Sequence, residues 1–144
     1  MGAWASDAFG NDDACDWAFG LENAKDLSLI ENTLDTVLSK AEEYVESPEA
    51  CEALAAIEVI ARLQGNWGER NAYTESVDKW VERAKIKPTA ALARKAHLVI
   101  VRILAENSEL KELWAESEDY ETWQASVVEL RNRVIANKPI EPTR

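Results

Sequence analysis

A carboxylate within an apolar segment is the first candidate for chemistry in this sequence. Glu58 interrupts "ALAAIEVIARL" (residues 53–63), where burial would cost free energy unless a cation neutralised the carboxylate. Arg62, four residues later, and Arg102, which interrupts a second apolar segment, are the expected partners. The alternative is a general base in a cleft, with a raised pKa. We expect the structural ion pair and no catalytic residue.

Oxygen, nitrogen and sulfur ligands for a metal are present but poorly arranged. Asp12, Asp13 and Asp16 could offer oxygens to Mg²⁺ or Ca²⁺, yet their spacing does not match a calcium loop. Acidic residues at this point also suit the first turn of a helix. The single histidine, His97, and the two cysteines, Cys15 and Cys51, lack the spacing of a zinc site. We therefore expect no metal and no cofactor.

Two features are candidates for binding a protein partner. The segment "AEEYVESPEACE" (41–52) holds five acids within eleven residues, and Trp67 stands in the loop "GNWGER". An exposed loop tryptophan is a common hot spot of interfaces. The predicted partner-binding residues are Glu42, Glu43, Glu46, Glu49, Glu52 and Trp67.

The charge is large, negative and unevenly distributed along the chain. The net charge is −11, and residues 1–60 hold 14 acids and 2 bases, or −12. Residues 61–104 hold 4 acids and 9 bases (+5), and residues 105–144 hold 9 acids and 5 bases (−4). This balance argues against nucleic acid as a ligand, because nucleic-acid binding needs a basic surface. It leaves room for a cationic protein partner, with solubility as the alternative reason for the acidity.

Length and composition are those of one globular domain, which we place at residues 1–144. The chain has 144 residues, of which 47% are hydrophobic and 30% charged. No apolar run is long enough to span a membrane, and the first residues lack the basic and apolar regions of a secretory signal. We therefore expect a cytoplasmic protein without membrane association, whose two cysteines are reduced.

The apolar periodicity is helical, and no strand-like alternation occurs. Asn11 is a candidate cap for a first short helix, and Thr74 and Ser108 for two later ones. Pro48 and Pro88 favour the first turns of two further helices. The predicted helices cover about 27–45, 47–65, 75–85, 88–106, 108–116 and 119–136, after the short helix that follows Asn11.

Two of these helices are apolar almost all round, in residues 53–63 and 96–104. Such helices belong at the centre of a domain, with amphipathic helices packed around them. Trp17, Trp80, Trp114 and Trp123 fall within predicted helices and are expected in the core. The predicted fold is all-α, an irregular multi-helix bundle around two central apolar helices.

The opening "MGAWASDAFGNDDACDWAFGLE" resembles a family of small bacterial proteins known as domain of unknown function 4259. Members begin with Met-Gly-Ala-Trp, followed by a Phe, an Asn-Asp pair and an Asp-Trp pair. "ALAAIEVIA" (53–61) and "SELKELWAE" (108–116) resemble further family segments, whereas Ala5-Ser6 stands where a Gly is common. The resemblance implies no activity, and it suggests that the motif's aromatic residues dock the N-terminus on the bundle. The matching motif residues are Met1, Gly2, Ala3, Trp4, Phe9, Asn11, Asp12, Asp16 and Trp17.

Three functions remain open on the sequence alone. The first is a protein–protein interaction module, specifically an immunity protein that neutralises a nuclease-type toxin, because carboxylates could occupy the basic cleft of a nuclease. The second is a helical module with a regulatory role. The third is an enzyme of unfamiliar type that uses Glu58 or the Asp12 and Asp16 pair. We expect the first and expect no enzymatic activity.

Overall fold

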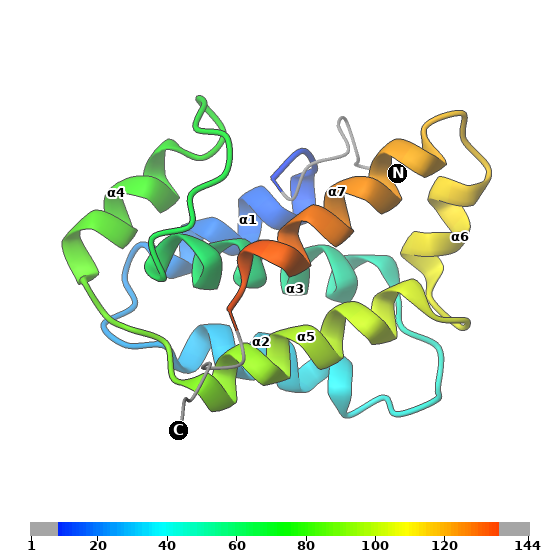
Figure 1. Ribbon diagram of the computed structural model, residues 1–144, viewed down its shortest axis with the longest axis horizontal. Helices are drawn as coiled ribbons and strands as arrows, with labels where there is room; N and C mark the ends of the chain where they lie inside the picture. Colours follow the sequence, from blue (N-terminus) through cyan, green and yellow to red (C-terminus); the bar gives the residue numbers. More distant parts are fainter. Residues whose placement is uncertain (1–8, 136–144) are drawn as a thin grey trace, which may run out of the picture.

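The computed structural model describes residues 9–135, which fold into seven helices around a single core (Figure 1). Within this range no strand forms, so the all-α prediction is confirmed. None of the helices among these residues is long and apolar enough to cross a membrane. The helices are α1 (Asp12–Leu21), α2 (Ser28–Leu38), α3 (Ser47–Leu63), α4 (Glu75–Ala84), α5 (Ala90–Leu104), α6 (Glu109–Ala115) and α7 (Tyr120–Arg133).

Side-chain caps explain where three of the helices begin. The Asn11 carboxamide oxygen accepts a hydrogen bond from the Ala14 N–H at 2.8 Å. The Ser108 hydroxyl accepts one from the Lys111 N–H at 3.4 Å, so these two predicted caps are confirmed. Thr89 caps α5 in the same way, and this helix begins at Ala90 rather than at Pro88. Each cap satisfies an N–H group that the first turn leaves without a helical partner. The third predicted cap, Thr74, precedes α4 but makes no side-chain cap hydrogen bond, because its hydroxyl donates to Asp78 Oδ2 at 2.7 Å.

The second helix is shorter than the sequence predicts. We expected one helix over about 27–45, but α2 ends at Leu38 and the chain then turns through Ala41, whose φ is 52°. Val45 nevertheless remains fully buried, because it leaves the helix and forms an isolated parallel bridge with Ser108. An apolar residue that matches the helical period can thus lie in a loop and be buried there.

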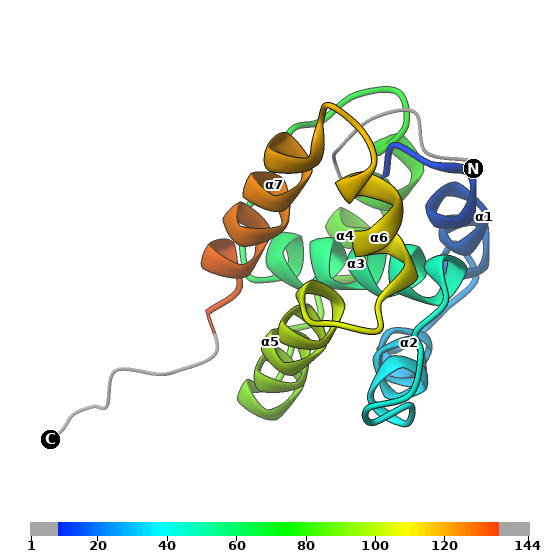
Figure 2. The same ribbon diagram turned by 90° about the vertical axis from the view of Figure 1, so that its right-hand side faces the viewer.

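Helix α3 is the axis of the bundle, and the six other helices all contact it (Figures 1 and 2). Its residues from Ala53 to Arg62 are all buried, including the charged side chains of Glu58 and Arg62. The many alanines of α3 allow neighbouring helices to approach closely on several sides. The prediction of a central apolar helix at 53–63 is therefore confirmed.

Helix α5, the second predicted central helix, is buried on one side only. Ala96, Val99, Ile100 and Ile103 face the core, where α5 contacts α2, α3, α6 and α7. The side chains of Leu98 and Val101 on its other side are 60% and 59% exposed. The bundle thus has one fully enclosed helix, and α5 forms part of its outer layer.

The four helical tryptophans lie in the core, as predicted. Trp17 Nε1 donates to Thr33 Oγ1 at 2.8 Å, and Trp80 Nε1 donates to the Ala24 carbonyl oxygen at 3.0 Å. Trp114 and Trp123 stack with ring centroids 6.2 Å apart, which joins α6 to α7. The expected docking of Trp4 lies outside the described residues.

Truncation of Trp17 should destabilise the protein strongly. Trp17→Ala removes a buried indole and leaves Thr33 Oγ1 without its donor. We expect a loss of about 3–5 kcal/mol in the free energy of unfolding, which denaturant titration would measure. A loss below about 1 kcal/mol would show that the indole contributes little to the core.

Candidate functional site

Two loops that lie far apart in the sequence meet at one end of the bundle. The Val45 N–H donates to the Asn107 carbonyl oxygen, and the Glu109 N–H donates to the Val45 carbonyl oxygen, both at 2.9 Å. Glu109 Oε1 also accepts from the Ser47 N–H at 2.8 Å. These bonds join the segment before α3 to the start of α6.

Arg102 holds the two loops together, and it does not pair with Glu58 as we considered from the sequence. Its guanidinium group donates to the carbonyl oxygens of Ala41 (2.6 Å) and Glu43 on one loop. It also donates to the carbonyl oxygens of Glu106 (2.8 Å) and Asn107 (3.3 Å) on the other. Five N–H donors in one plane allow an arginine to serve several carbonyls at once. Because Arg102 lies at the end of α5, it reaches the loops rather than the middle of α3.

The two joined segments lie at one end of the bundle (Figure 2), and we call the carboxylates that they contribute the acidic end. Residues 39–52 contribute five acids and one base, and residues 105–119 contribute six acids and one base. Of the two bases, Lys40 already pairs with Glu49 at 3.3 Å. The residues of the acidic end are Glu42, Glu43, Glu46, Glu49, Glu52, Glu106, Glu109, Glu112, Glu116, Glu118 and Asp119.

The glutamates predicted from the sequence to bind a partner belong only to the first half of this surface. Glu42, Glu43 and Glu46 are exposed there, while Glu49 and Glu52 are partly buried. The acids of residues 105–119 were missed because nothing in the linear sequence places them beside residues 39–52. The sequence shows the many acids of residues 105–119, but it does not show the contact between Val45 and Ser108 that brings them to residues 39–52.

The pKa values of Tyr44, Glu52 and Cys51, which lie at or near the acidic end, are raised. The Tyr44 hydroxyl donates to Glu112 Oε1 at 2.7 Å, and this bond, with the charges around it, raises the pKa of Tyr44 to about 12. Burial raises the pKa of Glu52, and the nearby Asp13 and Glu49 raise it further. Burial, and then the same acidic surroundings, raises the pKa of Cys51 to about 12. The acidic surroundings thus disfavour a further negative charge at this end.

The raised pKa of Glu52 predicts a pH-dependent stability change. Because the folded state favours the protonated carboxyl group, the ionised form of Glu52 opposes folding at neutral pH. Glu52→Gln should therefore raise Tm at neutral pH, and this gain should disappear as the pH falls until Glu52 is protonated. Thermal melts over this pH range test the prediction, with the exposed Glu43→Gln as control. A lower Tm for Glu52→Gln at neutral pH would contradict it.

A second group of charges surrounds Glu58, where the structure shows a larger network than the sequence predicted. The expected partner Arg62 has its Nε 3.4 Å from Glu58 Oε2 and 3.5 Å from Asp78 Oδ1. The unexpected partner is Arg133 of α7, whose Nη1 and Nη2 donate to the two Glu58 oxygens at 2.7 and 2.8 Å. This pairing and Glu129 raise the pKa of Arg133 further above its ordinary value. Glu58 is thereby held as one partner of a bidentate ion pair.

The loop after α3 closes over these charges. Arg62 donates to the carbonyl oxygen of Glu69 at 2.8 Å, and Arg133 donates to that of Asn66 at 3.2 Å. A side chain at Gly68 would come within 2.9 Å of Glu58 Oε2, so only glycine fits here without displacing the pair. A cavity of about 270 Å³ remains beside Glu58, Arg62 and Arg133.

Trp67 is less exposed than its place in a loop suggested. Its ring is partly buried against the core and lies between two guanidinium groups. The Arg70 guanidinium is 4.4 Å from the ring centroid and that of Arg62 is 5.4 Å away. These contacts are cation–π interactions within the chain. They give Trp67 a structural role in covering the Glu58 network.

The remaining candidates for chemistry are dispersed. Asp12 and Asp13 lie in the first turn of α1, as expected from their position after Asn11. His97 is partly buried, with Nε2 2.8 Å from the Val134 carbonyl oxygen. Cys15 Sγ lies 3.5 Å from the Phe9 carbonyl oxygen, and Cys51 is buried. Within residues 9–135, no three His, Cys, Asp or Glu side chains are arranged to hold a metal ion.

Neutralising Glu58 should cost far more stability than neutralising the other partner of Arg133. Glu58→Gln leaves the fully buried Arg62 and the partly buried Arg133 without their shared anion, so we expect a loss of about 3 kcal/mol. Glu129→Gln removes an exposed carboxylate 2.6 Å from Arg133 Nε and should cost less than about 1 kcal/mol. Denaturant unfolding of both variants measures the difference, and equal losses would contradict a buried network centred on Glu58.

Comparison with protein-family models identifies the family of this chain. Residues 2–126 match the model described as Domain of unknown function (DUF4259). The chain belongs to this family. No curated protein and no solved structure gives a significant match.

The part of the DUF4259 opening motif that the structure describes is structural. Phe9 and Trp17 are buried and Asn11 caps α1, whereas Asp12 and Asp16 are exposed. Met1, Gly2, Ala3 and Trp4 lie outside the described residues. The motif therefore anchors the start of the bundle and contributes no cluster of chemical groups within the described residues.

Proposed function

We propose that this DUF4259 protein is a protein–protein interaction module that binds a basic protein partner through its acidic end. The observation that supports this most is the convergence of eleven acids from residues 39–52 and 105–119, which are accompanied by only two bases. A stable surface that concentrates one sign of charge attracts and orients a partner of the opposite sign.

The rigidity of the acidic end favours binding over a role in solubility alone. A charged surface that only maintains solubility does not need a fixed backbone, yet here Arg102 donates to four carbonyl oxygens of the two loops. A backbone that is already held in place loses less conformational entropy when a partner binds than a flexible loop does. Burial raises the pKa of Glu52, so its carboxylate would gain from an external cation.

A toxin with a basic nucleic-acid-binding cleft is the type of partner that this surface fits best. Such a cleft must present cations to phosphates, and an array of carboxylates on a small domain could fill it. We therefore propose an immunity protein acting in the cytoplasm on a nuclease-type toxin. A regulatory helical module would use the same surface for a different basic partner, and the identity of the neighbouring gene product distinguishes the two.

An enzymatic role finds less support in the geometry. Both Glu58 oxygens accept hydrogen bonds from Arg133, and Arg62 lies beside them. A carboxylate held in this way is poorly placed to act as a general base, because both of its oxygens already accept hydrogen bonds within the chain. Asp12 and Asp16 are exposed to solvent, whereas acid–base chemistry is favoured where water is excluded.

The binding experiment uses the product of the neighbouring gene as probe, provided that this gene encodes a toxin or secreted effector. Replacing Glu42, Glu43 and Glu46 with Gln should slow association about tenfold at low salt and flatten its salt dependence. Glu112→Gln with Glu116→Gln should act in the same direction, because α6 completes the surface. Surface plasmon resonance at two salt concentrations measures both effects.

A matched control separates the acidic end from total charge. Replacing Glu22, Glu69 and Glu75 with Gln removes the same charge from exposed positions elsewhere and should leave association nearly unchanged. Unchanged affinity and salt dependence after neutralising the acidic end would remove it from the interface. Equal effects of the test and control variants would show that net charge, and not this surface, governs binding.

A further inference from the structure

The outer side of α5 carries an apolar stripe that the bundle does not cover. Leu98 and Val101, one helical turn apart, are 60% and 59% exposed. Ala91 and Ala105 continue the same line and are exposed, and Arg94 is the only charged residue on it. The spacing 91, 94, 98, 101, 105 alternates between three and four residues, which is the spacing of a helix–helix seam. Single exposed apolar residues are ordinary, but an aligned set on one helix indicates a contact surface.

The stripe is widened on its α7 side. His97 Nε2 lies 2.8 Å from the Val134 carbonyl oxygen, which brings the chain after α7 against α5. Ile135, the next residue, is 46% exposed. The uncovered apolar surface therefore includes residues of two elements.

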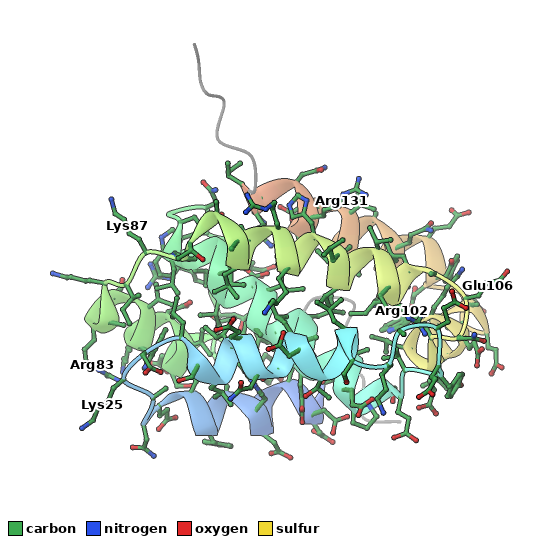
Figure 3. The ribbon with its side chains drawn as sticks, turned by 90° about the horizontal axis from the view of Figure 1, so that it is seen from below. Lys25, Arg83, Lys87, Arg102, Glu106 and Arg131 are labelled. Atoms are coloured by element: carbon green, nitrogen blue, oxygen red, sulfur yellow. The ribbon has the colours of Figure 1, made fainter. Side chains whose placement is uncertain are left out.

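Charge is separated along the axis of α5. Figure 3 shows Lys25, Arg83 and Lys87 at the end where α5 begins, and Arg102 and Glu106 at the end where it finishes. Residues 79–94 hold five bases and one acid, and we call this the basic end. At the opposite end Arg102 contributes one positive charge, whereas Glu42, Glu43 and Glu106 contribute three negative charges, so this end is acidic.

We propose that a second copy of this chain covers the stripe, with the two α5 helices packed antiparallel about a two-fold axis between Leu98 and Val101. In this arrangement Leu98 of one copy faces Val101 of the other. Arg94 then faces the helix end that carries Glu106, and each basic end lies beside the acidic end of its partner. A parallel pair would place like charges together, so the charge separation selects the antiparallel arrangement.

The self-association would share part of the acidic end with the proposed basic partner, because Glu42, Glu43 and Glu106 would lie beside the basic end of the second copy. In the view along the bundle from its acidic end, α6 faces the viewer and α5 lies along a lower edge (Figure 2). The two-fold contact would cover the α5 edge and leave the α6 part of the acidic end accessible. Failure of one proposal would therefore not decide the other.

The first test measures mass in solution by light scattering and sedimentation velocity. The wild-type chain should form a concentration-dependent dimer of twice 16.1 kDa. Val101→Asp should raise the dimer dissociation constant about tenfold or more, with an unchanged circular dichroism spectrum. Phe19→Asp is the matched control, because Phe19 is 66% exposed on α1, and it should remain dimeric. A wild-type monomer at every soluble concentration, or equal effects of the two variants, would overturn the proposal.

The second test determines the orientation by charge exchange. Arg94→Glu and Glu106→Arg should each weaken the dimer, because each replaces an opposed pair by two like charges. The double variant should recover the wild-type dissociation constant, since the exchange restores both pairs of a two-fold interface. Additive weakening in the double variant would overturn the antiparallel arrangement.

Discussion

The neutralisation of Glu58 inside the bundle is the constraint on which the rest of the structure depends. Helix α3 is enclosed by all six other helices, so the Glu58 carboxylate and the Arg62 guanidinium are almost completely withdrawn from solvent. Partners must therefore come from elsewhere in the chain, and Arg133 arrives from α7 and Asp78 from α4. The loop with Gly68 and Trp67 then closes over the charges. One buried anion thus fixes the relative positions of α3, α4, α7 and a loop.

Outside this centre, the bundle separates its surface charges. The basic residues of 79–94 lie at the opposite end from the loops 39–46 and 105–108, because α5 spans the whole length between them (Figure 3). Residues 79–94 hold five bases and one acid, although the net charge of the chain is −11. Both proposals depend on this charge separation. A basic partner would be attracted to the acidic end, and in the antiparallel pair the basic end of each copy would face the acidic end of the other.

The sequence predicted local features well and long-range contacts poorly. Asn11 and Ser108 could be identified as caps because a cap depends on the three residues that follow it. The end of α2 was missed because Val45 fits the helical period and is buried, but it is buried as a bridge partner of Ser108. Similarly, Arg62 was identified as a partner of Glu58 from its spacing of four, whereas Arg133 lies 75 positions away and no local pattern indicates it.

The bridge between Val45 and Ser108 also has a consequence for synthesis of the chain. The acidic end joins segments more than sixty residues apart, and α3, α4 and α5 lie between them. Contacts of such high sequence separation form late, because the intervening loop must be closed first. A nascent chain still lacking α6 therefore cannot present this surface, however many of its acids have been made. Charge recognition at this end would distinguish finished protein from unfinished or unfolded chains that have nearly the same composition.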